Sequence, residues 1–518
     1  MRSLASTTSY LELLRLASPE AVVVISALVV LTIGLMSGRA TGAAGVSPAK
    51  PPAGAAGIRL RRTATGWCSL VAALGVVIAI AAVLMLPRSA NLFGGMLVIT
   101  PLASLFKIIC LALAFFTVCL VRSEKSLRHP GEYLAIILLA TVGLMLLVGS
   151  EELLMIFIGL ELLGLSLYVM AAFDKTDLRS AEAGLKYFLF GSTSSAFTLF
   201  GISLIYGMSG STGLAAISAR LAAAPVQPLL ATGIIMTLIG FAFKIAAAPF
   251  HLWAPDAYQG APIPSAAFIA SGSKVASFVV LGKIVLVGFG PVHGNAGWHA
   301  MVAGWSPVLA VLAALSILIG NLVALAQTNV RRLLAYSAVA HAGYTLLGLV
   351  AGSRDGFSAT LFYAAVYAIT LVGAFGVVAV VRGETGDDDL KNFSGLAGRA
   401  PLLAGCMAVF MLSLAGIPPL AGFFAKFYLF SAALRAGGNY GLLWLIALAL
   451  FGSFVSLYYY LIVLKAIFVD EPSLTISSSA HRSSDLLQQI TVAVLAAAIL
   501  LLGLMPNTLA ARILAAVS

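Results

Sequence analysis

Charged residues are scarce in this chain. Of its 518 residues, only 9% are Asp, Glu, Lys or Arg, whereas 61% are hydrophobic and the mean hydropathy is +1.06. A soluble globular domain carries roughly 25% charged residues. The scarcity of charge therefore excludes a soluble globular fold and predicts an all-α polytopic membrane protein.

Cysteine is also rare, and the motifs that hold cofactors are missing from the sequence. Cys68, Cys110, Cys119 and Cys406 lie in or beside apolar runs, without a CxxC pair or a His/Cys spacing suited to a metal. We interpret them as small core residues. No GxGxxG or P-loop pattern is present to hold a nucleotide. We therefore expect no cofactor in this chain, and any coupled redox chemistry must take place elsewhere.

Long apolar runs, in contrast, fill most of the sequence. A spanning helix needs about 20 mostly apolar residues, and about fourteen runs meet that requirement. We predict spans near residues 20-37, 67-86, 95-121, 132-149, 152-172, 185-208, 227-250, 263-290, 301-326, 332-351, 357-382, 400-430, 440-468 and 488-505.

The net charge of +11 does not indicate a nucleic-acid partner, because the basic residues are scattered among short loops. Placing the N-terminus on the outer side of the membrane puts sixteen loop Lys and Arg residues on the inner side and seven on the outer side. The positive-inside rule favours this orientation. We therefore expect both termini to lie on the outer side.

Three polar stretches interrupt the apolar runs. The segment 38-66 is rich in Ala, Gly and Pro, and we expect a flexible cytoplasmic loop there. The segment 383-398 carries the run Asp387, Asp388 and Asp389, and the segment 470-485 is rich in Ser. Such charged runs are usually solvated loops, and docking faces for a partner are the alternative.

Proline interrupts two of the predicted spans. The run at 227-250 ends at Pro249, and the run at 400-430 contains Pro418 and Pro419. A break inside a membrane helix frees backbone groups that must be buried in protein or line a cavity. Broken helices five spans apart, each close to a lysine, indicate an internally repeated transporter with its site between the repeats.

Three lysines, Lys244, Lys274 and Lys426, lie in the middle of apolar segments. An ionisable side chain at such depth is costly and is by default a functional residue. The arginines fall in loops or termini, and only lysine can readily give up its proton when buried. Because snorkelling requires a position near a helix end, these three lysines predict proton transfer within the membrane.

Four other lysines in the apolar runs are less informative. Lys283 and Lys465 lie near span ends, where snorkelling is the better interpretation. Lys186, near the inner start of the sixth span, is either a proton-uptake site or an interfacial anchor. Lys107 follows Pro101 in a long span, and its depth is not fixed by the sequence.

Other ionisable or polar residues accompany the lysines. Glu161 is the only carboxylate well inside an apolar span, and it needs a cation, for which Lys244 is the candidate. Separating such a pair would favour release of the lysine proton. His341 lies mid-span with Ser337 one turn before it, and we favour a relay role over a plain core histidine.

Residues beside the first break and in the thirteenth span favour structural roles. His251 and Asp256 border the break, where hydrogen bonding of the loop is the favoured role. Tyr458, Tyr459 and Tyr460 indicate an interfacial or packing cluster, not a site.

Several long strings carry a family resemblance: PFHLWAPDAYQGAP, SGSKVASF, ALAQTNVRRLLAYSAVAHAGY, MLSLAGIPPLAGFFAKFYLF and LYYYL. Over roughly residues 90 to 468 the chain resembles subunit N of bacterial NADH:quinone oxidoreductase (respiratory complex I), one of the antiporter-like membrane subunits. The lysine in the twelfth helix resembles subunit N and not subunit M, and the short C-terminal region leaves no room for the lateral helix of subunit L.

The resemblance implies fourteen helices, with two inverted five-helix repeats and broken helices 7 and 12. The implied regions are 1-130 with three helices, 131-290 with the first repeat, 301-468 with the second repeat, and 488-518 with the last helix. Glu161 looks like the fifth-helix glutamate of the family. Lys244, Lys274 and Lys426 look like its lysines of helices 7, 8 and 12, and His341 looks like its central histidine.

The resemblance also implies a function: proton translocation from the cytoplasm across a bacterial inner membrane, coupled to quinone reduction. FMN, iron–sulfur clusters and quinone would lie in partner subunits, which include other antiporter-like and quinone-module subunits. The alternatives are a subunit of a multisubunit sodium/proton antiporter, the equivalent subunit of another redox-driven complex, and an inert scaffold. An inert scaffold would not need several mid-membrane lysines.

Overall fold

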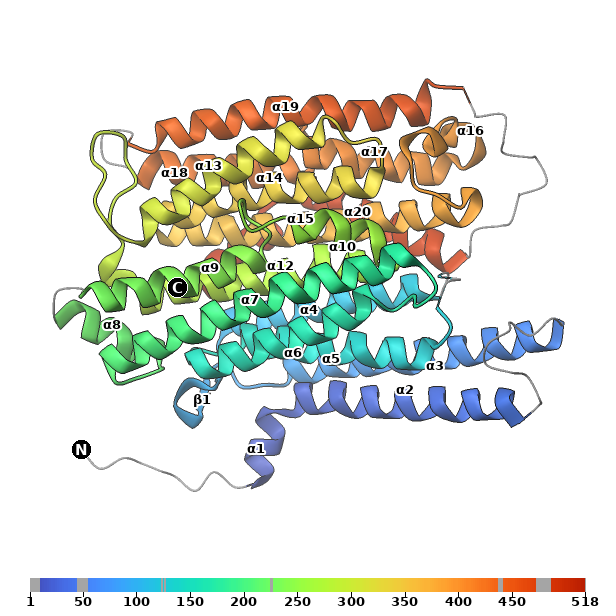
Figure 1. Ribbon diagram of the computed structural model, residues 1–518, viewed down its shortest axis with the longest axis horizontal. Coiled ribbons are helices and arrows are strands. Elements are labelled where there is room, and N and C mark those ends of the chain that lie inside the picture. The colour runs from blue at the N-terminus through green and yellow to red at the C-terminus, as the bar shows by residue number, and fades with distance from the viewer. Residues whose placement is uncertain are drawn as a thin grey trace.

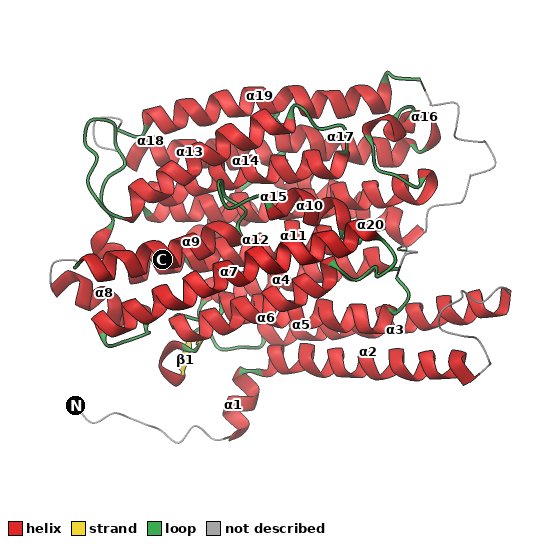
Figure 2. Cartoon of the chain, in the orientation of Figure 1, coloured by secondary structure: helices red, strands yellow, loops and turns green. Residues whose placement is uncertain are grey.

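The computed structural model describes residues 10–43, 55–122, 124, 127–223, 227–436, 441–471 and 486–517. Helices make up nearly all of it, and they run side by side along the long axis of the molecule (Figures 1 and 2). The first part of the chain forms α1 (Tyr10–Leu16), α2 (Ser18–Ala43), α3 (Ala55–Leu84), β1 (Ala90–Leu92), the 3-10 turn η1 (Phe93–Gly95), β2 (Leu97–Ile99), α4 (Pro101–Val121), α5 (Pro130–Val148) and α6 (Leu153–Ala171).

The rest of the chain continues the bundle. The middle part forms α7 (Leu178–Ser209), α8 (Leu214–Ala223), α9 (Pro228–Lys244), α10 (Trp253–Gly260), α11 (Ile263–Ala270), α12 (Gly272–Lys283), the π-helical turn η2 (Ile284–Gly288) and η3 (Gly290–Val292). The last part forms α13 (Trp305–Ala324), α14 (Val330–Val350), α15 (Arg354–Thr385), η4 (Leu390–Phe393), α16 (Leu396–Arg399), α17 (Pro401–Ala415), α18 (Ala421–Ala436), α19 (Leu443–Phe468), α20 (Leu486–Leu504) and α21 (Asn507–Ala516).

Local sequence signals explain where several helices begin. Thr100 caps α4 by accepting a hydrogen bond from the Ala103 amide, and Pro101 follows it at the first helical position. Asn329 caps α14 through the amides of Arg331 and Arg332. Polar caps of this kind satisfy amides that would otherwise lack partners at a helix start.

Twelve helices in the described residues are long and apolar enough to cross a membrane. The pairs α9/α10 and α17/α18 supply two further spans, each interrupted as the prolines predict. The predictions of an all-α polytopic fold with about fourteen spans and two broken helices are therefore confirmed. The inverted-repeat symmetry and the boundaries of the four regions stay predictions.

The broken helices share one backbone feature. The α9/α10 break contains a cis peptide bond before Pro249, and the α17/α18 break contains one before Pro419. A third interruption, at Ser271 between α11 and α12, was not predicted, because no proline marks it. It lies three residues before Lys274.

The bundle has two ends, named here after residues at them. The Arg331 end is where α14 begins and α15 finishes, and the Asp355 end is where α15 begins and where the β1–β2 hairpin and α8 lie (Figure 1). The helices α12, α14 and α15 form the interior, whereas α2 and α3 lie at one margin and α19 at the other.

The expectation of a flexible loop over 38-66 is wrong for much of that segment. Helix α2 continues to Ala43 and α3 already begins at Ala55. Apolar neighbours on each side extend the helical pattern into the Ala-rich sequence, and alanine is the best helix former. Residues 44–54 lie outside the described residues.

Candidate functional site

Lys274 lies at the centre of the bundle, on the first turn of α12. Its side chain is 3% exposed, and its Nζ donates a hydrogen bond to the Ala338 carbonyl of α14 at 2.7 Å. The Nζ also lies 5.6 Å from the centre of the Tyr367 ring of α15, within cation–π range. Three helices therefore meet at one buried ammonium group.

His341, on α14, is held between two tyrosines. Its Nδ1 is 2.7 Å from the hydroxyl of Tyr363, and its Nε2 is 3.0 Å from the hydroxyl of Tyr460. The Tyr460 hydroxyl is also 2.5 Å from the Ser337 hydroxyl. Since hydroxyl groups both donate and accept, these contacts suit either tautomer of the imidazole.

Lys426 lies beside the second helix break. Its Nζ donates hydrogen bonds to the Ala415 carbonyl at 2.8 Å and to the Ser453 hydroxyl at 2.7 Å. Ala415 is the last residue of α17, so the lysine donates to a carbonyl that the broken helix leaves without an intrahelical partner. The Tyr344 ring lies 5.3 Å from the same Nζ.

A small cavity joins His341 and Lys426. It offers about 10 Å³ to the centres of water molecules, which is room for about one water. Its lining comes from α14, α15, α17 and α18: His341, Tyr363, Val366, Tyr367, Thr370, Ser413, Leu414, Gly422, Ala425 and Lys426. One water there would have polar partners on both sides of the gap.

Glu161 and Lys244 are neighbours without a direct contact. Lys244 is the last residue of α9 and is 5% exposed. Its Nζ would lie 3.5 Å from a Cβ placed on Gly164, and Gly164 is one turn along α6 from Glu161. Glu161 instead accepts a hydrogen bond of 2.5 Å from the Ser195 hydroxyl of α7. The pair expected from the sequence is therefore held apart, by more than the 4 Å of an ion pair.

Lys186 lies near the Arg331 end and is partly exposed. Its Nζ is 2.6 Å from Glu182 Oε1 and 2.7 Å from Asp256 Oδ2. The other oxygen of Asp256 is 2.7 Å from Arg332 Nη1. Asp256 therefore links α7, α10 and α14 through ion pairs. This role goes beyond the hydrogen bonding of the loop that the sequence predicts for Asp256. In the described residues no hydrogen bond or ion pair connects this group with Lys244.

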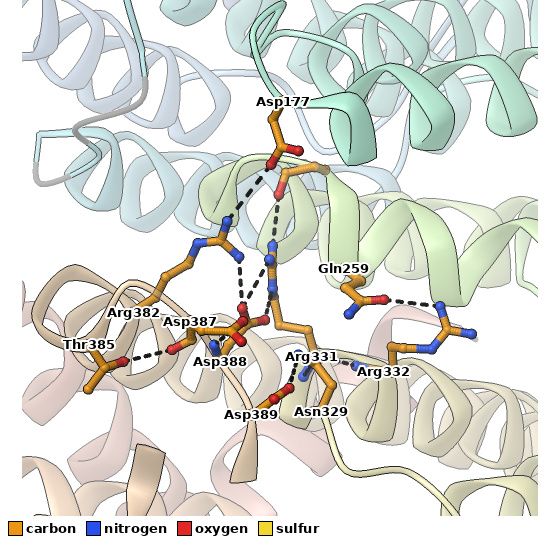
Figure 3. Close-up of polar contacts among 11 residues, drawn as sticks. Asp177, Gln259, Asn329, Arg331, Arg332, Arg382, Thr385, Asp387, Asp388 and Asp389 are labelled. Atoms are coloured by element: carbon orange, nitrogen blue, oxygen red, sulfur yellow. Dashed lines mark hydrogen bonds and ion pairs between the residues drawn. The ribbon is translucent and has the colours of Figure 1, made fainter. Parts of the chain in front are cut away.

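A second charged cluster at the same end has a buried ion pair, Arg331 with Asp388, and a partly exposed arginine, Arg382. Figure 3 shows Arg331 and Arg382 converging on Asp388, and Arg331 also donates to the Ala261 carbonyl at 2.9 Å. Burial alone would raise the pKa of the Asp388 carboxyl, but the two guanidinium groups outweigh it and hold that pKa below its usual value. The expectation of a solvated acidic loop is therefore wrong for Asp388, whose side chain is 0% exposed.

A third cluster lies at the Asp355 end and involves Lys107, whose depth the sequence left open, and Lys283, for which the expectation of snorkelling is wrong. Lys107 is 1% exposed and lies 2.6 Å from Glu20, which ties α4 to α2. Lys283 does not snorkel: it is 3% exposed and donates to the Val148 carbonyl at 2.9 Å, with Glu151 at 3.6 Å. Lys465, at 67% exposed, does reach the surface as expected.

The sequence interpretation missed the tyrosines around His341. Tyr460 was assigned to a packing cluster, yet it is 1% exposed and bonds the imidazole, whereas Tyr458 faces outward at 62% exposed. Tyr363 and Tyr367 are four residues apart on α15 and therefore share a face. The sequence contains that spacing. It does not show that this face of α15 meets His341, because the packing of the helices decides which faces meet.

The described residues contain no group of three or more His, Cys, Asp or Glu side chains that could hold a metal ion. The four cysteines are buried and unpaired with one another. The chemistry that this arrangement offers is proton exchange among lysine, histidine, tyrosine and serine side chains.

The comparisons with known proteins agree with this arrangement. Residues 150–456 match the family model described as "NADH:quinone oxidoreductase/Mrp antiporter, TM". NADH-quinone oxidoreductase subunit N 2 of Acidobacterium capsulatum is 45% identical over 97% of this chain and 98% of its own length. The subunit N protein of Trichlorobacter lovleyi is 42% identical over 77% and 80% of the two chains.

Solved structures show the same fold. A chain of respiratory complex I from Thermus thermophilus with bound aureothin superposes with a TM-score of 0.74 at 32% identity, over 95% of this chain and 98% of that one. A chain of the Mrp complex from Dietzia has a TM-score of 0.75 at 22% identity, over 96% and 97% of the chains, and so shows the fold alone. The chain therefore belongs to the NADH:quinone oxidoreductase/Mrp antiporter membrane family and, within it, to the NADH-quinone oxidoreductase subunit N proteins.

Proposed function

We propose that this chain is a proton-translocating subunit of the membrane arm of an NADH:quinone oxidoreductase. Protons pass through Lys274, His341 and Lys426, and the energy comes from quinone reduction in partner subunits. FMN and iron–sulfur clusters would lie in those subunits, with this chain working beside other antiporter-like and quinone-module subunits. The family membership and the buried ionisable residues support this function.

One observation carries the proposal: His341 lies between two buried ammonium groups and is hydrogen-bonded on both ring nitrogens. On one side a cavity with room for about one water separates it from Lys426. On the other side its ring centre is 4.9 Å from that of Tyr367, whose ring centre is 5.6 Å from Lys274 Nζ. The Tyr367 hydroxyl is buried without a partner in the described residues, which suggests a site for a bridging water.

The relay is proposed to work in short steps. A proton on Lys274 passes by way of Tyr367 and water to His341, and then through the single-water cavity to Lys426. Lysine and histidine each accept and release one proton, so every step returns the donor to a state that can be loaded again. The hydroxyls of Tyr363 and Tyr460 orient the imidazole.

Glu161 and Lys244 are proposed to gate the loading step. With Glu161 bonded to Ser195, Lys244 lacks a contacting anion, which favours its neutral form. Movement of Glu161 toward Lys244 would favour the charged form. We propose Lys186 as a proton-uptake site because it is partly exposed and contacts two carboxylates.

The proposed direction of transport is from the cytoplasm at the Arg331 end to the outer side at the Asp355 end of the bundle. This orientation rests on the distribution of Lys and Arg in the loops and places both termini on the outer side of a bacterial inner membrane.

The test compares Lys426→Met and His341→Phe with Lys465→Met in membranes that carry the assembled complex. Lys465 is the matched control, because it is an exposed lysine on α19. NADH-driven acidification should be lost in the first two variants and kept in the third, with NADH oxidation by an artificial acceptor unchanged. Undiminished pumping by Lys426→Met would overturn the proposal.

A sodium/proton antiporter subunit is the second candidate, favoured only by the shared family model and fold. Purification in mild detergent separates the two functions. If flavin and iron–sulfur subunits purify with this chain, the redox-driven function is supported. If other antiporter subunits purify with it and the flavin and iron–sulfur subunits do not, sodium/proton antiport is supported.

A further inference from the structure

A groove at the Asp355 end of the bundle has no role in the proposed proton path. It lies between the start of α15, the end of α18 and α21, and it measures about 370 Å³, within the range of about 300–1,000 Å³ that is usual for small-molecule sites. Its lining is Asp355, Ser358, Ala359, Phe362, Phe427, Tyr428, Ser431, Ala432, Arg435, Asn507, Ala510, Ala511 and Leu514.

The polarity of the groove changes with depth. Asp355 and Arg435 lie at the ends of their helices, whereas Phe362 and Phe427 lie seven and eight residues farther into them. At a rise of 1.5 Å per residue, the aromatic side chains are about 10–12 Å deeper than the charges. A membrane lipid has the same gradient, with a charged headgroup above apolar chains.

The polar groups of the groove are available to a ligand. Within the described residues, neither Asp355 nor Arg435 has an ion-pair partner within 4 Å, and both are exposed. The Ser358 hydroxyl is buried, with the residue 8% exposed, and has no hydrogen-bond partner in the described part of the chain. Such an orphaned polar atom in a groove wall indicates a missing partner.

We propose that this groove binds one phospholipid with a primary-amine zwitterionic headgroup, of the phosphatidylethanolamine class. Arg435 binds the phosphate, since a guanidinium suits phosphate oxygens. Asp355 accepts hydrogen bonds from the ammonium group, and an acyl chain lies against Phe362 and Phe427. This inference needs only the membrane location of the chain, and it does not depend on the proton path.

The charge pattern selects this lipid class. The Asp355 carboxylate repels an anionic headgroup that has no amine, such as phosphatidylglycerol. A choline headgroup carries a positive charge but no N–H donor, so it cannot make the charge-assisted hydrogen bond. A primary ammonium supplies both.

The lateral wall of the groove is anchored independently of any ligand. Arg354 donates a hydrogen bond of 2.8 Å to the Leu514 carbonyl, which fixes α21 against the start of α15. The Phe362 and Tyr428 rings pack edge to face with their centres 5.4 Å apart, which fixes the floor. The groove is therefore preformed, and binding needs no rearrangement of these helices.

The experiment uses the whole complex in nanodiscs that contain photoactivatable phosphatidylethanolamine, phosphatidylglycerol or phosphatidylcholine. Labelled peptides are mapped by mass spectrometry. Phosphatidylethanolamine should label α15, α18 and α21, and Arg435→Gln or Asp355→Asn should each weaken labelling about tenfold, the effect of losing about 1.4 kcal/mol of binding. Ala511→Trp should block the groove without removing a charge, because Ala511 is an exposed lining residue of α21.

Arg220→Gln is the matched control, since Arg220 is an exposed arginine on α8, away from the groove. It should leave labelling unchanged. Equal labelling by the three lipids would overturn the choice of headgroup. Labelling that survives Arg435→Gln and Ala511→Trp, or cross-linking of a neighbouring subunit to the groove in place of lipid, would overturn the site.

Discussion

At the scale of single residues, the buried lysines differ in what accompanies their charge. Lys426 has a free carbonyl at a helix end, Lys274 has a carbonyl of α14 and a tyrosine ring, and Lys244 has no hydrogen bond in the described residues. An ammonium group taken out of water needs such partners. The differences suit a chain of groups that hold a proton with unequal strength.

Tyr460 gives a residue-scale prediction. Tyr460→Phe removes the hydroxyl that bonds His341 and Ser337, so NADH-driven proton pumping should fall about tenfold, as one hydrogen bond of about 1.4 kcal/mol implies. Tyr458→Phe is the control, because Tyr458 lies two residues earlier and is exposed; this variant should pump normally. The rate of fluorescence quenching in inverted vesicles measures both, and equal rates would remove Tyr460 from the relay.

At the scale of elements, the helix breaks place the functional groups. Proline marks the α9/α10 and α17/α18 breaks in the sequence, and each break lies beside a lysine. The Ser271 break and the β1–β2 hairpin were not predicted, because small residues and short apolar stretches there also fit a continuous span. Element-level prediction was thus best where the local chemistry forbids a helix.

Gly416 provides an element-scale test at the second break. Its φ is +86°, and a Cβ there would lie 2.9 Å from Lys426 Cδ. Gly416→Ala should therefore cost about 1–2 kcal/mol in backbone strain and displace Lys426, with a lower melting temperature and slower pumping.

Gly405 is the control for that change, because it lies within α17 and a Cβ there would contact nothing within 4 Å. Gly405→Ala should keep full pumping and leave the melting temperature unchanged or higher, since alanine favours a helix over glycine by about 1 kcal/mol. If both variants behave alike, the break does not position Lys426.

At the scale of the whole molecule, buried and partly buried ion pairs join distant parts of the chain. Arg331, Arg382 and Asp388 bring the start of α14, the end of α15 and the loop before η4 together (Figure 3). Asp256 adds a link from α7 to α14 through Lys186 and Arg332. Removing one member of a buried pair costs more than the pair contributes, because a charge is left uncompensated.

Asp388→Asn should therefore destabilise the protein by about 3–5 kcal/mol at neutral pH. The effect should depend on pH, because the folded-state pKa of Asp388 is lower than its unfolded value. Its stabilisation is fully present above the ordinary carboxyl pKa of about 3.9 and is lost as pH falls through the folded value.

Thermal unfolding of the purified complex checks this prediction. The wild type and Asp388→Asn should differ most near pH 7 and converge in strongly acidic buffer. Asp389→Asn is the control, because the Asp389 side chain is 35% exposed and its Oδ2 lies 3.9 Å from Lys391 Nζ. Identical melting of Asp388→Asn and Asp389→Asn would contradict the structural role.

The sequence by itself determined the membrane-spanning, all-helical fold, the two proline breaks and the identity of the ionisable residues within the spans. Each of these follows from local physics, namely the cost of charge in lipid and the inability of proline to continue a helix. Only the tertiary structure decided the partners: Tyr460 and Tyr363 on His341, Ser195 on Glu161, Glu20 on Lys107 and two arginines on Asp388. Those contacts join helices far apart in the chain, and their rotation about their own axes is fixed by packing, which no local pattern encodes.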